Sequence, residues 1–190
     1  MPTRQPRPRL WLMTDERQGD ELWAALAGLP PGAGVIFRHY RTPRAERRRL
    51  YEAVRTVARR QRLVLVLAGP ARLAAAWRAD GAHGRAVRRT SRPLLYTAPA
   101  HDLTELRAST RAGADLVFLS PVFATRSHPG DRTLGPTRFG ALTRAGAGAG
   151  VIALGGMDAA RARRLKALGS YGWAAIDALT PDQKRKAVPT

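Results

Sequence analysis

The sequence predicts a (β/α)₈ barrel, a closed parallel sheet of eight strands with helices between them. Eight short apolar runs alternate along the chain with segments of helical character, and most of the runs are continuously apolar. Continuous apolar runs indicate strands buried on both faces, and eight such units favour a closed barrel over an open doubly wound sheet. An open nucleotide-binding sheet would also require a glycine-rich turn after its first strand. Residues 15–19 (DERQG) do not form a glycine-rich motif.

The expected elements follow in order. Strands are predicted at 10–14, 34–38, 63–68, 80–83, 93–97, 115–119, 150–154 and 172–176. Helices are predicted at 20–27, 43–60, 71–78, 102–112, 137–144 and 158–168. Asp20, Thr42, Asp102 and Asp158 are expected N-caps, and Pro43 suits the first position of its helix. Because barrels of this kind usually need about 250 residues, the helices and loops of a chain this short must be trimmed.

The length suits one domain. We expect a basic, flexible N-terminus at 1–9, a barrel at 10–180 and a C-terminal tail at 181–190. The chain has no cysteine, which excludes disulfides and thiolate chemistry. The apolar stretch after residue 9 stops at Asp15 and is too short for a signal peptide or a membrane span, so a cytoplasmic protein is predicted.

The chain is strongly basic, with 33 Lys+Arg against 14 Asp+Glu and a formal net charge of +19. Its densest run of arginines, 44–62, has helical spacing and is interpreted as a solvated helix face. Charge of this sign also suits a polyanion, so a basic polyanion-binding protein is retained as an alternative. Nucleic acid is the less favoured partner, because no interleaved aromatic stacking platform accompanies the arginines.

A glycine pair ends the seventh predicted strand. Gly155 and Gly156 are followed by a helix capped by Asp158, and glycines let a backbone approach a ligand while the helix presents free N–H groups. The end of the eighth strand, Ile176 and Asp177, lies beside it in a barrel. Phosphate sites recur after the last two strands of this fold, which favours a phosphate site over a simple tight turn.

A long polar loop follows the sixth strand. Thr125 and Ser127 offer hydroxyls there, and Arg126 and Arg132 offer positive charge for a phosphate or diphosphate. A loop of this length in so short a chain is usually functional or mobile. His128 is interpreted as a loop residue rather than a base.

Arg38 ends the second predicted strand. Side chains alternate along a strand, so Arg38 shares the interior side with Ile36 and His39 takes the other side. Arg38 then either rises into the site or forms a rim salt bridge with Asp15 or Asp80. Two histidines are weaker candidates: His83 could face the site, and His101 is interpreted as a capping or packing residue. No His/Cys/Asp cluster at metal-ligand spacing is found.

Taken together, the sequence resembles the thiamine-phosphate synthase family and its thiazole tautomerase (TenI-like) branch. The matching segments, in family order, are 12–15, 37–38, 79–83, 112–115, 120–125, 152–157 and 172–176. The resemblance implies a transferase of thiamine biosynthesis that couples a hydroxymethylpyrimidine diphosphate to a thiazole phosphate, giving thiamine phosphate and pyrophosphate. It also implies Mg²⁺ as cofactor and a homodimer.

The resemblance also implies roles for particular residues. Arg38 would contact the pyrophosphate, and the loop with Thr125 and Ser127 would contact both phosphate groups. The thiazole phosphate would be held by Gly155, Gly156 and the backbone near Ile176 and Asp177.

The chain departs from the family at its metal ligands. The Asn-Asp expected after the third strand is replaced within 68–70 (AGP), and the second acidic position falls in the basic stretch 85–89. The Gln and Lys expected on either side of Arg38 are Ile36 and Tyr40, and the tautomerase histidine is Pro121. Three hypotheses stand: a synthase whose arginines replace much of the Mg²⁺ function, a non-catalytic or altered relative that binds thiazole phosphate or thiamine phosphate, and the polyanion-binding protein.

Overall fold

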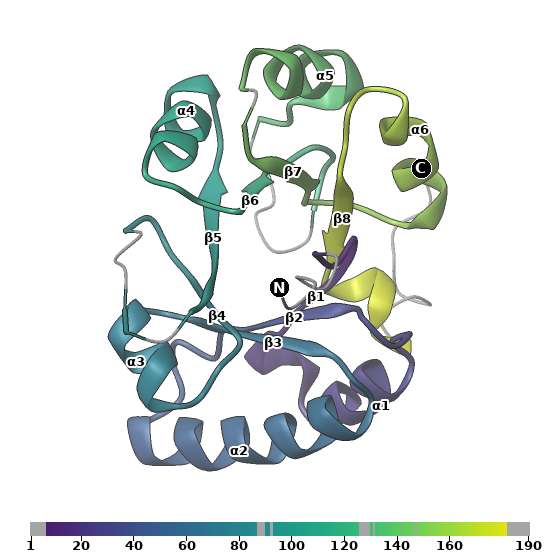
Figure 1. Cartoon of the computed structure of the whole chain (residues 1–190). Helices are drawn as coiled ribbons and strands as arrows, with labels where there is room; N and C mark the ends of the chain where they lie inside the picture. The colour runs from purple at the N-terminus through teal and green to yellow at the C-terminus, as the bar shows by residue number, and fades with distance from the viewer. Residues whose placement is uncertain are drawn as a thin grey trace.

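Eight parallel strands form a closed barrel, in which each strand pairs with the next and β8 pairs with β1 (Figure 1). This computed structural model describes residues 7–86, 90–91, 93–125, 130, 132–146 and 148–181. The strands are β1 Leu10–Met13, β2 Gly34–Phe37, β3 Val64–Ala68, β4 Gly81–His83, β5 Leu95–Ala100, β6 Leu116–Leu119, β7 Gly150–Ala153 and β8 Gly172–Ala175. The predicted fold class is confirmed.

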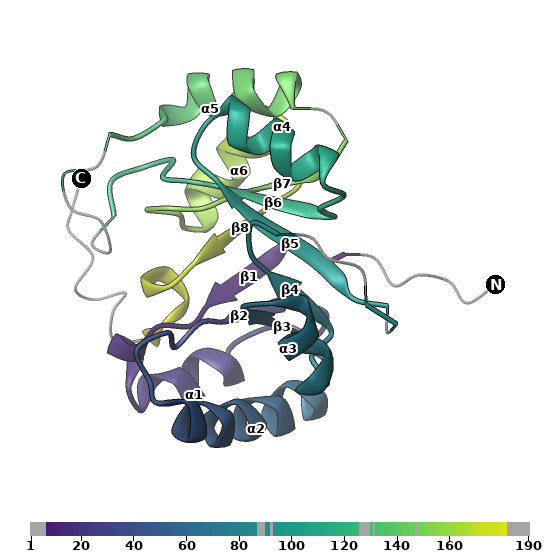
Figure 2. The same cartoon turned by 90° about the vertical axis from the view of Figure 1, so that its left-hand side faces the viewer.

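Helices surround the barrel, with α1 and α2 on the β2–β3 side and α4 and α5 on the opposite side (Figure 2). They are α1 Glu21–Ala27, α2 Arg44–Arg60, α3 Ala71–Ala76, α4 Leu103–Arg111, α5 Gly135–Ala145 and α6 Ala159–Lys166. Short 3-10 helices cover Glu16–Gln18 and Asp177–Leu179. Within the described ranges, no helix has both the length and the apolar character needed to cross a membrane.

The core has an interior layer and an outer layer, because strand side chains alternate between them. In β2, Ile36 belongs to the interior cluster, whereas Val35 and Phe37 pack outward with α2. The interior cluster comprises Trp11, Met13, Ile36, Val66, Ala68, Leu116, Phe118, Ile152 and Ala174. Burying one such large side chain stabilises the fold by about 2 kcal/mol. The barrel is therefore a packed core, and its interior offers no room for a ligand.

Trp11 fills the interior near the N-terminal ends of the strands. Its ring contacts Phe118 edge-on, with ring centroids 5.4 Å apart, and its Nε1 donates to the Pro8 carbonyl at 2.9 Å. Gly34 makes room for it, because a Cβ there would lie 2.2 Å from the indole ring. Arg7 pairs with Asp115 at 2.5 Å, so residues 7–9 of the segment predicted to be flexible lie against this end of the barrel.

The fifth strand was predicted at 93–97 and lies at Leu95–Ala100 instead, so its predicted end was wrong. The observed strand includes Pro99, which cannot donate a ladder hydrogen bond. The carbonyl of Thr97 accepts from Gly84, on the β4 side. The backbone nitrogen of Pro99 faces the same side as Thr97. Because β4 ends at His83, no strand residue there requires an N–H donor from position 99. The strand continues because Ala98 and Ala100 pair with β6.

The helix starts confirm part of the predicted capping. The side chains of Asp102 and Asp158 each accept a backbone N–H at 2.8 Å, from Glu105 and Arg161. Thr42 does not cap α2, because Pro43 is extended (φ −53°, ψ 143°) and is itself the N-cap. Asp20 precedes α1 without a capping hydrogen bond from its side chain. The other boundaries shift by one or two residues, as strand and helix ends commonly do.

Candidate functional site at the C-terminal mouth of the barrel

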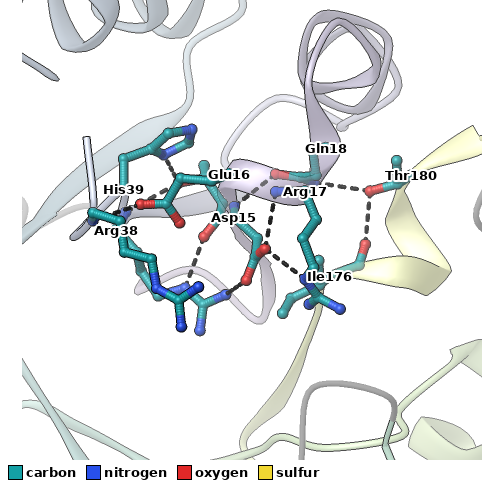
Figure 3. A network of polar contacts seen from close by, with 10 residues as sticks. Asp15, Glu16, Arg17, Gln18, Arg38, His39, Ile176 and Thr180 are labelled. Carbon is teal, nitrogen blue, oxygen red and sulfur yellow. Dashed lines mark hydrogen bonds and ion pairs between the residues drawn. The ribbon is translucent and has the colours of Figure 1, made fainter. Parts of the chain in front are cut away.

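Charged side chains gather where β8, β1 and β2 end (Figure 3). Asp15, Glu16 and Arg17 follow β1, Arg38 follows β2, and Ile176 follows β8. These strands are neighbours in the barrel, so their carboxyl ends bring the three segments together at one rim. Function in this fold concentrates at that rim.

Asp15 is the centre of this network. Its Oδ1 accepts from the Nε of Arg17 at 2.7 Å and from the Arg17 backbone N–H at 3.1 Å, and its Oδ2 accepts from the Nη2 of Arg38 at 2.7 Å. Burial raises the pKa of this carboxyl, but the hydrogen bonds from Arg17 and the charge of Arg38 outweigh it, so the pKa is lowered overall. One carboxylate thus holds two guanidinium groups at the mouth.

Arg38 lies as its strand position predicted. Its Nε donates to the Thr14 carbonyl at 2.7 Å, which fixes the guanidinium over the interior side of the barrel. Burial lowers the pKa of Arg38, and the carboxylate of Asp15 offsets part of that effect. His39 takes the opposite side and stacks on Phe37 with ring centroids 4.7 Å apart. Of the two expected arrangements for Arg38, the salt bridge with Asp15 is the one present, and it forms at the mouth.

The end of β8 is tied to the loop after β1. Gln18 donates to the hydroxyl of Thr180 at 2.8 Å, and that hydroxyl donates to the Ile176 carbonyl at 2.9 Å. The Oδ1 of Asp177 is buried and has no hydrogen-bond partner among the described residues. The charge of Asp177 helps to raise the pKa of Arg17, after the larger effect of Asp15. The predicted segment Ile176–Asp177 is therefore rigidly joined to the arginine network.

The glycine pair lies on the other side of the mouth, against the loop after β6. Gly155 and Gly156 have φ of +93° and +59°, which few residues besides glycine adopt. A Cβ on Gly155 would lie 2.8 Å from Pro121, and one on Gly156 would lie 2.3 Å from the Ala124 carbonyl oxygen. Close approach of the loop is thus sufficient reason for both glycines, whether or not a ligand binds.

Hydrogen bonds lock this corner to the same loop. The N–H groups of Val122 and Phe123 donate to the carbonyls of Leu154 and Gly155 at 2.9 and 3.0 Å. Arg161 donates to the Gly156 carbonyl, and its guanidinium lies 4.7 Å from the centroid of the Phe123 ring. In the part of the chain that the structure describes, no acceptor is found for the Gly155 and Gly156 N–H groups. The corner and the polar loop therefore share one rim, as the sequence predicted.

The remaining loop residues are only partly placed. Thr125 is half-buried at the end of the segment that covers the glycines. Arg126, Ser127 and His128 lie outside the described residues, and Arg132 is exposed. The structure brings Thr125 to the rim beside Gly156 and leaves the roles predicted for Arg126 and Ser127 as predictions.

His83 lies inside the barrel below the mouth. Its Nδ1 and the Thr97 hydroxyl are 2.9 Å apart, and its ring meets Phe118 edge-on. Burial, with a smaller effect of the Arg38 charge, lowers the pKa of His83 to about 4, so it is neutral at pH 7. His101 precedes Asp102, the N-cap of α4, and its backbone N–H and ring Nδ1 both contact the Glu105 carboxylate at 2.9 Å.

The segment after β3, where the family's Mg²⁺ carboxylate is expected, carries no acidic residue. Mg²⁺ prefers several oxygen ligands, carboxylates above all. After β3 the chain passes through Gly69 and Pro70 into α3, and the Ala68 carbonyl accepts from Arg47 at 2.8 Å. Both oxygens of Asp15 are taken by arginines, and no group of three His, Cys, Asp or Glu side chains gathers in the described ranges.

Sequence reasoning missed Arg17 and the link between Gln18 and Thr180. One signal for part of this was present. Asp15 and Gln18 have the spacing of a capping box, and the structure contains one at Glu16–Gln18. In a short helix that begins there, Arg17 lies close enough to bond the side chain of the N-cap residue, Asp15. The Gln18–Thr180 contact joins residues 162 apart in sequence and has no local signal.

The fold and rim define a (β/α)₈-barrel protein with an arginine-rich C-terminal mouth. Residues 11–179 match the thiamine monophosphate synthase family, and the chain belongs to that family. The family is that of thiamine-phosphate synthase, a transferase; its members bind small phosphorylated substrates, and the synthases use Mg²⁺.

Named relatives agree with the family assignment. The chain is 27% identical over 179 residues to "Putative thiamine-phosphate synthase 2" of Aquifex aeolicus, which covers 89% of this chain and 96% of the relative. It is 31% identical over 123 residues to the thiamine-phosphate synthase of Geobacillus thermodenitrificans, covering 60% and 56%. The structure of a thiamine phosphate pyrophosphorylase from Pyrococcus furiosus matches with a TM-score of 0.74 at 22% identity, covering 95% of each chain, and supports the fold.

Proposed function

We propose that this protein is a thiamine-phosphate synthase in which arginine side chains, rather than Mg²⁺, carry the charge of the pyrophosphate. The observation that carries the proposal is the pairing of Arg17 and Arg38 on the single carboxylate of Asp15 at the mouth. Two guanidinium groups so placed offer paired N–H donors to a diphosphate, which a guanidinium binds as a fork.

The reaction asks two things of the mouth. The C–O bond between the pyrimidine methylene and its diphosphate breaks, and the electron pair leaves with the diphosphate. The ring nitrogen of the thiazole phosphate then forms the new C–N bond. Donors that meet the leaving diphosphate stabilise the charge that develops on it, and this is usually the largest contribution to catalysis. We assign that role to Arg38 and Arg17.

The other side of the mouth suits the thiazole phosphate. The N–H groups of Gly155 and Gly156 lie at the end of β7, and Ile176 and Asp177 lie at the end of β8, which pairs with it. Backbone N–H groups bind phosphate without adding charge. The charge of Asp177 acts on Arg17 and would repel a phosphate, so the phosphate would take the backbone side. Thr125, with the predicted Ser127 and Arg126, would complete this side.

The test is product formation by the purified full-length chain. Both precursors are supplied with Mg²⁺ or with EDTA, and thiamine phosphate is measured after conversion to a fluorescent derivative. We expect product in both conditions. Product only with Mg²⁺ would refute the arginine substitution, and no product in either would refute synthase activity.

A matched pair of variants locates the activity. Arg38→Ala should lower kcat/KM by about a hundredfold, the usual cost of one transition-state donor. Arg41→Ser is the control, because its side chain is exposed on the same loop and only its backbone N–H bonds Glu16. Equal activity in the two variants would remove Arg38 from the site.

A second function is favoured by one observation. No carboxylate follows β3, where Gly69 and Pro70 lead directly into α3, so a relative that binds thiazole phosphate or thiamine phosphate without turnover is the alternative. Calorimetry separates the two: binding of thiamine phosphate with no product in either condition supports the alternative. Gly156 should not be the test residue, since a side chain there would displace the loop.

A further inference from the structure

A basic cavity lies outside the barrel, between the start of α2 and α3. It has a volume of about 740 Å³, and its walls include Tyr40, Arg44, Arg47, Arg72 and Trp77. No lining residue is acidic. Cavities of this size commonly hold a small ligand. Tyr40 and Pro70 lie in the loops that follow β2 and β3, so the cavity adjoins the rim of the mouth on its outer side, where Arg47 reaches the Arg38 carbonyl.

Arg47 is held in one position at the back of this cavity. Its Nε and Nη2 donate to the Arg38 carbonyl at 2.9 and 2.7 Å, and its Nη2 also donates to the Ala68 carbonyl at 2.8 Å. Its guanidinium carbon lies 5.6 Å from the centroid of the Trp77 ring and 5.9 Å from that of Tyr40. The remaining nitrogen, Nη1, has no acceptor within the described residues. A cation already fixed in this way loses little entropy on binding an anion.

The other walls add uncompensated charge and aromatic surface. Arg44 and Arg72 are exposed and form no ion pair within the described ranges. Tyr40 is 65% exposed, although it is a large aromatic side chain. An exposed aromatic ring beside three guanidinium groups can stack on a planar ring while the arginines bind an attached phosphate.

We propose that this cavity binds a nucleoside phosphate, with the base against Tyr40 and the phosphate among Arg44, Arg47 and Arg72. A phosphate alone would use the arginines and leave the aromatic wall unused, and a neutral nucleoside would leave the positive charge uncompensated. Binding there requires no turnover at the mouth.

The test is calorimetric titration of the full-length chain with AMP, adenosine and inorganic phosphate at one ionic strength. AMP should bind at least about tenfold more tightly than either fragment, because it alone uses both walls. Inorganic phosphate binding as tightly as AMP would overturn the proposal, as would the absence of AMP binding. Tight binding of a single-stranded oligonucleotide that displaces AMP would overturn it in favour of nucleic acid.

Substitutions of the lining residues test where AMP binds. Arg44→Ser and Arg72→Ser should each weaken AMP binding by about tenfold, and so should Tyr40→Ala. Arg49→Ser is the matched control, because Arg49 is exposed on α2 and does not line the cavity. Arg17→Ala, at the mouth, should also leave AMP affinity unchanged. Loss of AMP binding in Arg17→Ala, or equal effects of the Arg44 and Arg49 variants, would contradict the site. Melting temperatures measured alongside show that each variant is folded.

Discussion

The two sides of the barrel mouth are built differently. On the side of β8, β1 and β2, the rim is made of side chains whose charges pair through Asp15. On the side of β6 and β7, the rim is made of backbone, with Gly155 and Gly156 packed against residues 121–124. Charged side chains at a rim can be replaced with little change in the fold. The two glycines cannot, because any side chain there would collide with residues 121–124. The charged side is therefore where this chain can differ from its family and keep its structure.

The largest effect is expected from breaking the backbone side. Gly156→Ala places a Cβ 2.3 Å from the Ala124 carbonyl oxygen at a φ of +59°, so it combines a clash with a strained backbone. We expect a loss of about 4 kcal/mol in the free energy of unfolding, measured by urea denaturation. Gly113→Ala is the control, since its φ is +88° but no atom lies within 4 Å of the added Cβ, and it should cost about 1 kcal/mol. Equal losses would show that the loop does not constrain the corner.

The next largest effect is expected from His83, which lies inside the barrel below the mouth. The folded chain holds the pKa of His83 at about 4, below its ordinary value of 6.5, so the unfolded chain takes up a proton that the folded chain does not. Stability is then complete above pH 6.5 and falls as the pH drops from 6.5 toward 4, by about 3 kcal/mol at most. His39, whose pKa burial also lowers, adds to the fall in the same direction.

Urea denaturation at pH 7 and pH 5 measures this fall. His83→Gln should reduce the difference in unfolding free energy between the two pH values, because glutamine does not titrate. The explanation fails if His83→Gln keeps the full difference.

The smallest effect is expected on the charged side. Arg17→Ala should raise the pKa of Asp15, because the Arg17 side chain supplies the largest of the contributions that lower it. The free energy of unfolding should change by less than about 1 kcal/mol, since the Arg17 side chain is 43% exposed and solvent screens such pairs. NMR titration of the Asp15 carboxyl measures the shift, with Arg41→Ser as the control. An unchanged pKa in Arg17→Ala would mean that Arg38 and the backbone alone hold this carboxylate.

The sequence predicted the barrel because each strand is a separate apolar run, a local signal. It also predicted the direction of Arg38, because alternation along β2 fixes which side a residue takes. It did not predict that Asp15 joins Arg17 to Arg38, since this depends on where two strands end in space. Nor did it reveal that Gly155 and Gly156 fit the loop after β6. The same glycine pair is expected in a sequence whether a ligand or another segment of the chain approaches the backbone. The end of the fifth strand could not be predicted locally, because Pro99 is accommodated only where the neighbouring strand β4 has already ended.

The most direct test of the account is diphosphate binding by Asp15→Asn, measured by calorimetry without Mg²⁺. If Arg17 and Arg38 form the diphosphate site, replacing Asp15 removes the carboxylate charge that both guanidinium groups share. The affinity for inorganic diphosphate should then rise by about tenfold over the unmodified chain, while Arg38→Ala should lose binding. An unchanged or weaker affinity in a folded Asp15→Asn variant would contradict the claim that this side of the mouth holds the diphosphate.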